Sequence, residues 1–316
     1  MEKRTLGKTG LEVSPIAFGG NVFGWTVDEK RSFELLDQWA EIGFNFIDTA
    51  DSYSNWVPGN KGGESETIIG NWMKKHGNRD KIIISTKVGS ELGPGKKGTS
   101  KKYIMEAAEA SLRRLQTDYI DLYQSHWPDP ETPYEETLEA YGQLMQQGKI
   151  RAFGTSNYSV EQLTASFEAA KKHGLVPYLT LQPEYNLYDR SGFENGLQQL
   201  CIEHSMGVIC YFSLASGFLT GKYRTEEDLS KSQRGGGIKK YFNERGFRIL
   251  KALDEVSAKY HTTLSSVSIA WLLTRPGITA PIASATSAEQ IKALVEATEL
   301  RLNNEDVDLL TEASSE

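Results

Sequence analysis

Residues 44–53, FNFIDTADSY, change from an apolar run to a polar one within a few positions. Asp48 stands where the apolar run ends, and Tyr53 follows in the next segment. A tyrosine can act as a general acid when a cation beside it stabilises the phenolate and lowers the phenol pKa from about 10 toward neutrality. Asp48 and Tyr53 are therefore candidates for one acid–base site, and that site requires a cation.

Lys87 and His126 could complete this site. Lys87 falls at the end of the apolar run 81–89, and His126 at the end of the run 119–127. A buried lysine is costly without an anion, so we expect Lys87 to pair with Asp48. His126 could hydrogen-bond a substrate oxygen. Each of these residue types is commonly structural when it occurs alone, but four of them on three consecutive strand–loop units favour catalysis.

Eight apolar runs can supply the strands that position these residues. They cover residues 15–20, 44–48, 81–89, 119–127, 150–157, 178–185, 207–214 and 279–284. Helical patterns lie between and after them, near 28–43, 64–76, 101–115, 134–147, 159–174, 192–205, 244–260, 264–275, 287–298 and the C-terminus. This alternation predicts an α/β protein with a parallel sheet, and the even spacing favours a closed (β/α)8 TIM barrel with extra helices over an open doubly wound sheet. The segment 4–13, RTLGKTGLEV, predicts an N-terminal β-hairpin.

The C-terminal strand ends form the active face of such a barrel. Nearly every predicted strand ends in a polar group, and no linker rich in proline or serine divides the chain. We therefore expect one domain over residues 1–316, with its site at that face.

Composition and charge exclude several classes of protein. The chain has 35 Lys and Arg against 42 Asp and Glu, a net charge of −7, which argues against nucleic-acid binding because phosphate contacts need clustered cations. No apolar run approaches the ~20 residues of a membrane span. Cys201 and Cys210 fall on apolar patterns and are expected to pack as reduced thiols. Without a signal-peptide pattern at the start, a cytoplasmic location is expected.

The motifs together resemble the aldo-keto reductase family over essentially the full chain. FIDTADSY, IIISTKVG and IDLYQSHWPD occur in the family's order and spacing, followed by GTSNYS, LQPEYNLYDR and GFLTGKY. The resemblance implies a (β/α)8 barrel that binds NADPH in an extended conformation and reduces aldehydes and ketones without a metal. It assigns Asp48, Tyr53, Lys87 and His126 as the catalytic tetrad, with Tyr53 as the general acid.

The resemblance also implies a set of cofactor contacts. Ser156, Asn157 and Gln182 match residues that hydrogen-bond the nicotinamide carboxamide, and Tyr211 matches the residue that stacks on its ring. The remaining candidates near the nicotinamide and the pyrophosphate are Gly20, Asn21, Ser213, Leu214, Gly217 and Lys222. Many relatives have a proline and a basic residue where this chain has Ser213 and Ser216, so the pyrophosphate contacts depart from the family pattern.

The adenosine end departs further from the family pattern. Many members carry a basic residue after the last strand to hold the 2′-phosphate, but this chain has Ser284, Thr286 and Gln290 there. Neutral donors bind phosphate more weakly than charged ones. Arg234 and Lys240, in a Gly- and Lys-rich loop, could compensate for the missing charge. NADPH is the expected cofactor, with NADH as the alternative.

One glycine-rich segment mimics a nucleotide-binding motif. Residues 93–98, GPGKKG, satisfy G-x-G-x-x-G, but a true dinucleotide fingerprint opens a helix directly within a tight βαβ unit. Here a proline, two lysines and Thr99-Ser100 separate the glycines from the next helix. We therefore interpret the segment as a loop at the barrel mouth.

Aromatic residues near the predicted mouth suggest the substrate walls. Trp25 or Phe23, with Trp56 and Trp127, would suit apolar or aromatic aldehydes and flat ketones. A small-molecule carbonyl is thus the expected partner, and a monomer is expected because no exposed apolar seam is visible.

Two other functions remain open at this stage. One is a nicotinamide-binding regulatory subunit with little turnover. The other is a barrel glycosidase that uses two of the acids Asp121, Asp129 and Glu184, although their strand positions do not suggest a facing pair.

Overall fold

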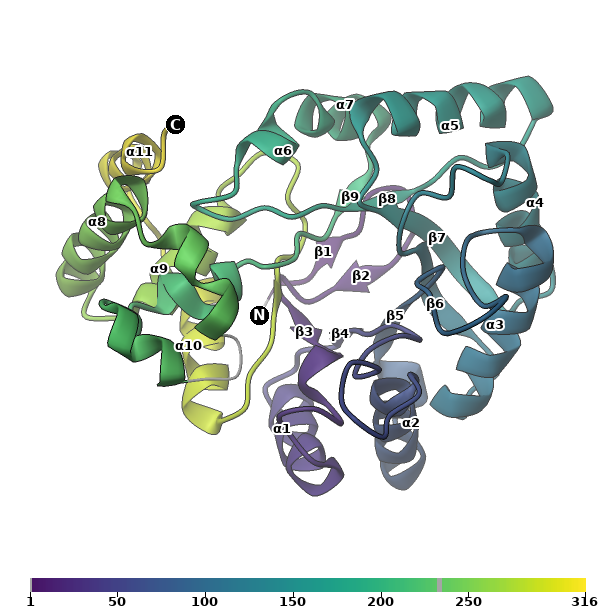
Figure 1. The fold of residues 1–316 in the computed structure, drawn as a ribbon, viewed down its shortest axis with the longest axis horizontal. Helices are drawn as coiled ribbons and strands as arrows, with labels where there is room; N and C mark the ends of the chain where they lie inside the picture. The colour runs from purple at the N-terminus through teal and green to yellow at the C-terminus, as the bar shows by residue number, and fades with distance from the viewer. Residues whose placement is uncertain (1, 232–234) are drawn as a thin grey trace.

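A computed structural model describes residues 2–231 and 235–316 and shows eight parallel strands surrounded by helices (Figure 1). The strands are β3 (Ala17–Gly19), β4 (Phe46–Asp48), β5 (Ile83–Val88), β6 (Ile120–Ser125), β7 (Ile150–Ser156), β8 (Thr180–Gln182), β9 (Gly207–Val208) and β10 (Ile282–Ala283). They are hydrogen-bonded in the order β10-β3-β4-β5-β6-β7-β8-β9. Each predicted apolar run therefore supplies one strand, shortened to the residues that pair.

The sheet closes into a barrel between its first and last members. Val208 bridges Ile278 in parallel, and the Ile282 N–H donates to the Cys210 carbonyl oxygen at 2.8 Å. β10 pairs in turn with β3. The predicted (β/α)8 barrel is confirmed.

The helices follow the predicted pattern with one interruption. They are α1 (Glu29–Glu41), α2 (Glu64–His76), α3 (Lys101–Leu115), α4 (Tyr134–Gln146), α5 (Val160–His173), α6 (Ser191–Glu194), α7 (Leu197–His204), α8 (Glu244–Tyr260), α9 (Leu264–Leu273), α10 (Ala288–Glu299) and α11 (Asn304–Ala313). The single helix expected at 192–205 is two, because Gly196 has φ of 106° and breaks the helical path. Side-chain caps start many of them, as when Ser100 accepts a hydrogen bond from the Tyr103 N–H.

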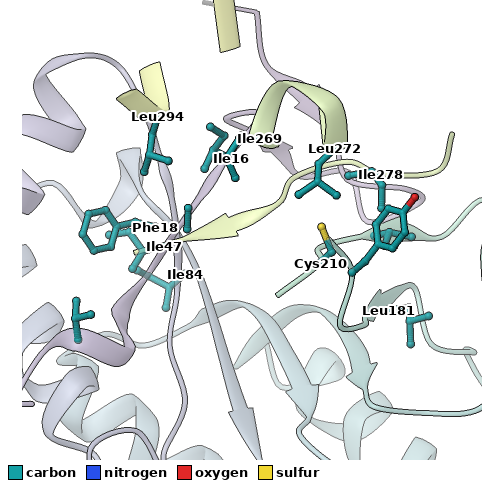
Figure 2. Packing of buried hydrophobic residues seen from close by; sticks show 14 of the residues in the cluster. Ile16, Phe18, Ile47, Ile84, Leu181, Cys210, Ile269, Leu272, Ile278 and Leu294 are labelled. Carbon is teal, nitrogen blue, oxygen red and sulfur yellow. The ribbon is translucent and has the colours of Figure 1, made fainter. Parts of the chain in front are cut away.

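The main core lies between the strands and the helices. Figure 2 shows Phe18, Ile47 and Ile84 from the strands near Ile269 of α9 and Leu294 of α10, all fully or almost fully buried. Cys201 and Cys210 belong to this core and are free thiols, as the sequence predicted. Packing of the apolar helix faces against the strands holds the barrel wall in place.

The predicted N-terminal hairpin covers one end of the barrel. β1 (Arg4–Thr5) and β2 (Glu12–Val13) pair antiparallel. Leu6, Leu11 and Val13 join a second buried cluster with residues from inside the barrel, including Phe46 and Leu122. A Cβ on Gly7 would lie 2.2 Å from the N atom of Gly207 in β9, so only glycine permits this approach. The hairpin thus fills the N-terminal end and leaves the C-terminal end for the site.

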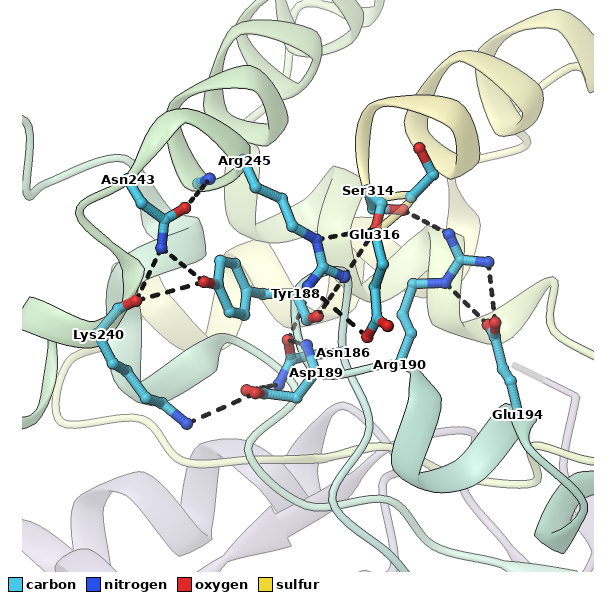
Figure 3. A network of polar contacts seen from close by, with 12 residues as sticks. Asn186, Tyr188, Asp189, Arg190, Glu194, Lys240, Asn243, Arg245, Ser314 and Glu316 are labelled. Carbon is cyan, nitrogen blue, oxygen red and sulfur yellow. Dashed lines mark hydrogen bonds and ion pairs between the residues drawn. The ribbon is translucent and has the colours of Figure 1, made fainter.

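Arginines attach the end of the chain to the barrel. Arg190 donates to the Thr311 carbonyl oxygen and the Ser314 hydroxyl. Arg245 donates to the Ser314 and Tyr188 carbonyl oxygens, and Figure 3 shows both arginines beside Ser314. These contacts join α11 to the segment that follows β8. Within residues 2–231 and 235–316, no helix is long and apolar enough to cross a membrane.

Candidate active site

Asp48, Lys87 and Tyr53 meet at the C-terminal end of the barrel. The Lys87 Nζ lies 2.7 Å from Asp48 Oδ2, which makes the predicted ion pair, and it donates to the Tyr53 hydroxyl at 2.9 Å. The Tyr53 hydroxyl also lies 3.3 Å from Asp48 Oδ2, and the Thr49 carbonyl oxygen accepts a third bond from Lys87 Nζ at 2.7 Å. Both charged side chains are fully buried. The lysine is thus held by three oxygens, one of them the phenol oxygen.

A chain of polar side chains inside the barrel positions Asp48. Its Oδ1 accepts hydrogen bonds from Ser85 Oγ and Gln182 Nε2, each at 3.0 Å. Gln124 Nε2 in turn donates to Ser85 Oγ at 2.9 Å. Sequence analysis missed Ser85 and Gln124, although Ser85 stands two residues before Lys87 and so shares its face of the strand. That alternation was the signal that could have identified it.

The pKa of Tyr53 does not move in the expected direction. Burial raises it to about 12, although Lys87 opposes this shift, and Asp48 raises the pKa further. The expectation of a pKa lowered toward neutrality is therefore wrong for the protein without substrate, because desolvation of the phenolate outweighs the attraction of the lysine. The phenol is protonated at neutral pH and can donate its proton.

Lys87 is a cation despite its burial. Desolvation is the largest effect and lowers its pKa, but the attractions of Asp48 and Tyr53 outweigh it, and the net pKa is raised. The ion pair therefore maintains a positive charge 2.9 Å from the phenol oxygen.

His126 lies beside Tyr53 and is neutral. The two ring centroids are 6.1 Å apart, and the Ser90 hydroxyl lies 2.9 Å from His126 Nδ1. Burial, and then the nearby Lys87, hold the pKa of His126 well below its usual value. When Ser90 donates to Nδ1, the Nε2–H is left as a donor. Ser90 is a third residue that sequence analysis missed, after Ser85 and Gln124.

The residues expected to hold a nicotinamide form one hydrogen-bonded group. Tyr211 donates through its hydroxyl to Asn157 Oδ1 at 2.7 Å, and Asn157 Nδ2 donates to the Ser156 hydroxyl at 3.1 Å. Ser156 Oγ donates to the Gln182 carbonyl oxygen at 2.8 Å. Asn157 has φ of 64°, an unusual conformation for a residue other than glycine. The group adjoins Asp48 through Gln182, so its donor and acceptor chemistry fits a carboxamide beside the tetrad.

The expected pyrophosphate segment is compact and partly strained. Ser216 and Gly217 have φ of 56° and 99° within the short 3-10 helix η3 (Ala215–Thr220). Lys222 is exposed, and its Nζ lies 3.4 Å from the Cβ position of Gly217, whereas Leu214 is half-buried. The side chain of Ser213 is buried and donates to the Cys210 carbonyl oxygen at 3.3 Å. The sequence had placed that hydroxyl among the cofactor contacts.

The residues at the ends of β3 and β10 pack closely together. Ser284 Oγ donates to Asn21 Oδ1 at 2.6 Å, and a Cβ on Gly19 would lie 2.5 Å from that same Oγ. Gly20 is buried, and its carbonyl oxygen accepts a hydrogen bond from Ser65 at 2.8 Å. These residues border the strand ends β3 and β10, as predicted.

An arginine that the sequence did not suggest lies at the expected adenosine end. Arg31 of α1 donates through Nε to the Thr286 carbonyl oxygen at 3.4 Å, and it pairs with Glu34 at 2.6 Å. Thr286 and Gln290 are exposed and bonded to each other, with Gln290 Oε1 accepting from the Thr286 N–H at 2.7 Å. No sequence signal links Arg31 to Thr286, because 255 positions separate them.

Arg234 and Lys240 were predicted to supply the positive charge that is missing at the 2′-phosphate end. Arg234 lies outside the described residues. Lys240 Nζ lies 3.5 Å from Asp189 and 3.7 Å from Glu184, two carboxylates of the loop after β8. Figure 3 shows the contact with Asp189.

Three of the four aromatic candidates are linked by ring contacts to Tyr53 or His126. Trp25 contacts Trp56 edge-on at a centroid distance of 5.5 Å, and Trp56 lies 6.4 Å from the Tyr53 ring. Trp127 stacks on His126 at 5.8 Å. Trp56 and Trp127 are half exposed, at 49% and 50%. Such large apolar surfaces beside a polar site suit an apolar ligand.

Phe23 does not belong to this wall. It is fully buried and stacks on Phe18 at 5.3 Å within the main core. A phenylalanine suits either a substrate wall or the core, and the turn after β3 directs the Phe23 side chain into the core.

Two acids of the glycosidase hypothesis, Asp121 and Asp129, are each engaged by a separate set of neighbours. Asp121 is buried between Arg79 and Arg151, and it accepts a bond from the Ile84 N–H. Asp129 accepts bonds from Thr99 and Thr132.

Residues 93–98 form a loop, and α3 begins later at Lys101, as expected. Among residues 2–231 and 235–316, no group of three or more His, Cys, Asp or Glu could hold a metal ion.

Comparison with known proteins gives a consistent match. The model of the aldo/keto reductase family matches residues 15–315. Aldo-keto reductase YhdN of Bacillus subtilis is 35% identical, with 97% of this chain and 91% of that protein covered. A probable voltage-gated potassium channel subunit beta of Arabidopsis thaliana is also 35% identical, covering 95% and 92%. The uncharacterized oxidoreductase YrpG of Bacillus subtilis is 32% identical, covering 99% and 95%.

Proposed function

Because the chain belongs to the aldo/keto reductase family, we propose that it is an NADPH-dependent reductase that converts small aldehydes and ketones to alcohols. The family supports a nicotinamide-dependent oxidoreductase in general, and the arrangement of Asp48, Tyr53, Lys87 and His126 supports the specific reaction. A bound reduced nicotinamide would supply the hydride.

One observation carries this proposal. The Tyr53 hydroxyl accepts a hydrogen bond from Lys87 while Lys87 is paired with Asp48. As negative charge develops on a carbonyl oxygen, Tyr53 delivers its proton to that oxygen. Lys87 then stabilises the phenolate at a distance of 2.9 Å. The electrostatic benefit is large because the site is buried and the charges are already in place.

His126 has a separate role in this proposal. It is neutral, and Ser90 orients its ring. Its Nε2–H donates to the carbonyl oxygen and so directs that oxygen toward Tyr53. Trp25, Trp56 and Trp127 flank this position and would contact the organic part of the substrate.

The residues present fit a nicotinamide dinucleotide. Asn157, Ser156 and Gln182 present amide and hydroxyl groups beside the tetrad, and Tyr211 offers a ring next to them. Gly217 and Lys222 would hold the pyrophosphate with Leu214. Thr286, Gln290 and Arg31 would meet the 2′-phosphate, where the guanidinium provides the charge that the family's usual basic residue would supply. This arrangement favours NADPH over NADH.

Replacement of Tyr53 by phenylalanine tests the reaction. Nicotinamide absorbance is followed with wild type and Tyr53→Phe, using an activated aromatic aldehyde and either NADPH or NADH. We expect turnover to fall by at least about 100-fold, the usual contribution of a general acid, while cofactor binding measured by fluorescence is retained. Tyr119→Phe is the matched control, because Tyr119 lies before β6 and its ring stacks on Arg79 away from the tetrad. Equal turnover in wild type and Tyr53→Phe would refute the proposed role.

A second candidate function has one specific observation in its favour. The Arabidopsis thaliana relative named a probable voltage-gated potassium channel subunit beta matches this chain as closely as YhdN does. We propose as the alternative a nicotinamide-binding regulatory subunit with little turnover. Tight cofactor binding by wild type, without reduction of any carbonyl in a broad panel, would favour this alternative.

A further inference from the structure

Asp51 is a buried acid that the proposed reaction does not use. It lies between Asp48 and Tyr53 in the chain, and 1% of its surface is exposed. Both of its carboxylate oxygens lack a hydrogen-bond partner within residues 2–231 and 235–316. Its backbone N–H donates to the Lys87 carbonyl oxygen at 3.2 Å, so its main chain is fixed beside the strand that carries the lysine.

Glu66, a second buried acid in this region, has the partners that Asp51 lacks. Its Oε1 accepts a hydrogen bond from the Thr86 hydroxyl at 2.6 Å, and its Oε2 accepts one from Arg114 Nε, also at 2.6 Å. Glu66 is fully buried on α2. The nearby guanidinium is therefore engaged by Glu66.

Two glycines allow the chain to close tightly over Asp51 and Arg114. A Cβ on Gly62 would lie 2.8 Å from the Asp51 carbonyl oxygen, and a Cβ on Gly63 would lie 2.4 Å from Arg114 Cδ. Both glycines have positive φ, near 90°. The turn that they form packs directly against the backbone of Asp51 and the side chain of Arg114, and it limits the space for solvent.

The buried charges near Asp51 already form two neutral ion pairs without it. Lys87 pairs with Asp48 at 2.7 Å, and Arg114 pairs with Glu66 at 2.6 Å. An ionised Asp51 would be a third anion facing two cations. An unpaired buried carboxylate costs several kcal/mol, and such a group takes up a proton instead.

The groups that surround Asp51 support the same conclusion. Burial, and then Glu66, raise the pKa of Asp51 well above its usual value, while Arg114, Lys87 and a weak contact with the Ser52 N–H oppose the shift. Two phenols of the adjoining elements, Tyr103 of α3 and Tyr123 of β6, also interact with it electrostatically. Burial is the largest effect on the pKa of each of these phenols and raises it, so both are neutral.

We propose that Asp51 is a neutral carboxylic acid in the folded protein and acts as a positioning residue for Tyr53 and Lys87. In this state the two ion pairs leave no net charge behind the phenol. A negative charge on Asp51 would favour the protonated phenol still further and so weaken Tyr53 as an acid. The part of this inference that concerns Tyr53 as an acid rests on the proposed function, whereas the protonation state of Asp51 does not.

Infrared spectroscopy of the whole protein at pH 7 tests the protonation state directly. We expect a carbonyl-stretch band of a protonated carboxylic acid in wild type that shifts when aspartate is labelled with carbon-13 and disappears in Asp51→Asn. Asp121→Asn is the matched control: Asp121 is also buried, but it is paired with Arg79 and Arg151, so the band should persist. Absence of a label-sensitive acid band in wild type would overturn the proposal, whether or not the variant folds.

Unfolding by urea across a pH series gives a second test. The folded protein retains the proton of Asp51 above the ordinary aspartate pKa of about 3.9, where the unfolded chain releases it. The stability of wild type therefore falls as pH rises from that value toward the raised pKa, and Asp51→Asn lacks this loss. We expect the unfolding midpoint of the variant to rise relative to wild type as pH increases. A constant difference, or one of the opposite sign, would show that Asp51 is already ionised.

The catalytic consequence is measured separately. The pH profile of carbonyl reduction should show wild type losing rate relative to Asp51→Asn, several-fold, at pH values where the acid band disappears. Parallel profiles would refute the positioning role. If neither protein reduces a carbonyl, the proposed function fails, while the infrared and unfolding results still decide the state of Asp51.

Discussion

The Tyr53 hydroxyl lies between a cation and an anion, and its burial decides its charge. A pKa of about 12 means that the phenol carries its proton throughout the neutral range. Delivery of that proton to a carbonyl oxygen therefore needs no prior uptake of a proton from solvent. The reverse reaction, alcohol oxidation, would need the phenolate, which is scarce at neutral pH. In the proposed reaction, Tyr53 therefore starts in the protonated form that a general acid requires.

Arg31 provides a prediction about cofactor choice. Removal of its charge in Arg31→Gln should raise the Kd for NADPH by about 5- to 10-fold, or about 1 to 1.4 kcal/mol, because a half-exposed arginine that also pairs with Glu34 contributes modestly. The Kd for NADH, which lacks the 2′-phosphate, should be unchanged. Titration followed by nicotinamide fluorescence measures both. Lys30→Gln removes the neighbouring exposed charge and serves as the control, and a parallel change in both Kd values would contradict the assignment.

At the scale of elements, α2 and α3 pack closely and thereby place the Glu66–Arg114 pair. Gly70 of α2 permits this approach, because a Cβ there would lie 2.2 Å from the Arg114 carbonyl oxygen. Helix α2 also begins at Glu64, directly after the two glycines that cover Asp51 and Arg114. Helices α2 and α3 thus carry Glu66 and Arg114, and the turn of Gly62 and Gly63 leads directly into α2.

Substitution of Gly70 by alanine separates helix propensity from packing. Alanine favours a helix by up to about 1 kcal/mol over glycine, but the contact with a backbone oxygen cannot relax without separating the helices. We expect Gly70→Ala to lower the free energy of unfolding by about 1 to 3 kcal/mol in urea. Gly142→Ala on α4 is the matched control, since its Cβ would meet nothing within 4 Å, and it should be neutral or stabilising. A stabilised Gly70→Ala protein would show that the helices can separate at little cost.

At the scale of the whole molecule, contacts between distant parts of the chain complete the barrel. The Ile282 N–H to Cys210 carbonyl bond joins β10 to the segment after β9, and the N-terminal hairpin fills the opposite end. The C-terminal residues return to the segment after β8, where Arg190 and Arg245 bind them (Figure 3). That segment carries Glu184, which bridges Tyr211, so the last residues of the chain support one side of the site.

Loss of Arg190 should therefore weaken the whole fold. Its side chain is 15% exposed, pairs with Glu194 and donates to Thr311 and Ser314. Arg190→Ala should lower the free energy of unfolding by about 2 kcal/mol, because charged hydrogen bonds inside the protein are lost together. Arg301→Ala, at an exposed arginine that bonds only to neighbouring carbonyls among the described residues, should change it by less than about 0.5 kcal/mol. Similar midpoints for the two variants would show that the attachment is dispensable.

The sequence by itself determined the order of strands and helices and the placement of Asp48, Lys87 and His126 at strand ends, with Tyr53 in the loop after β4. Both follow from local patterns: the alternation of apolar runs with helical periodicity, and polar residues where an apolar run stops. The break between α6 and α7 was also local, since Gly196 stands in the sequence, but a periodic pattern on both sides concealed it.

Only the tertiary structure decided the properties that depend on burial and on contacts through space. The direction of the Tyr53 pKa depends on how much desolvation outweighs Lys87. The inward orientation of Phe23, the contact of Arg31 with Thr286 and the missing partners of Asp51 depend on segments that are distant in the chain. Periodicity describes which face of an element is apolar, whereas the electrostatic energy of a buried group depends on every neighbour that folding brings to it.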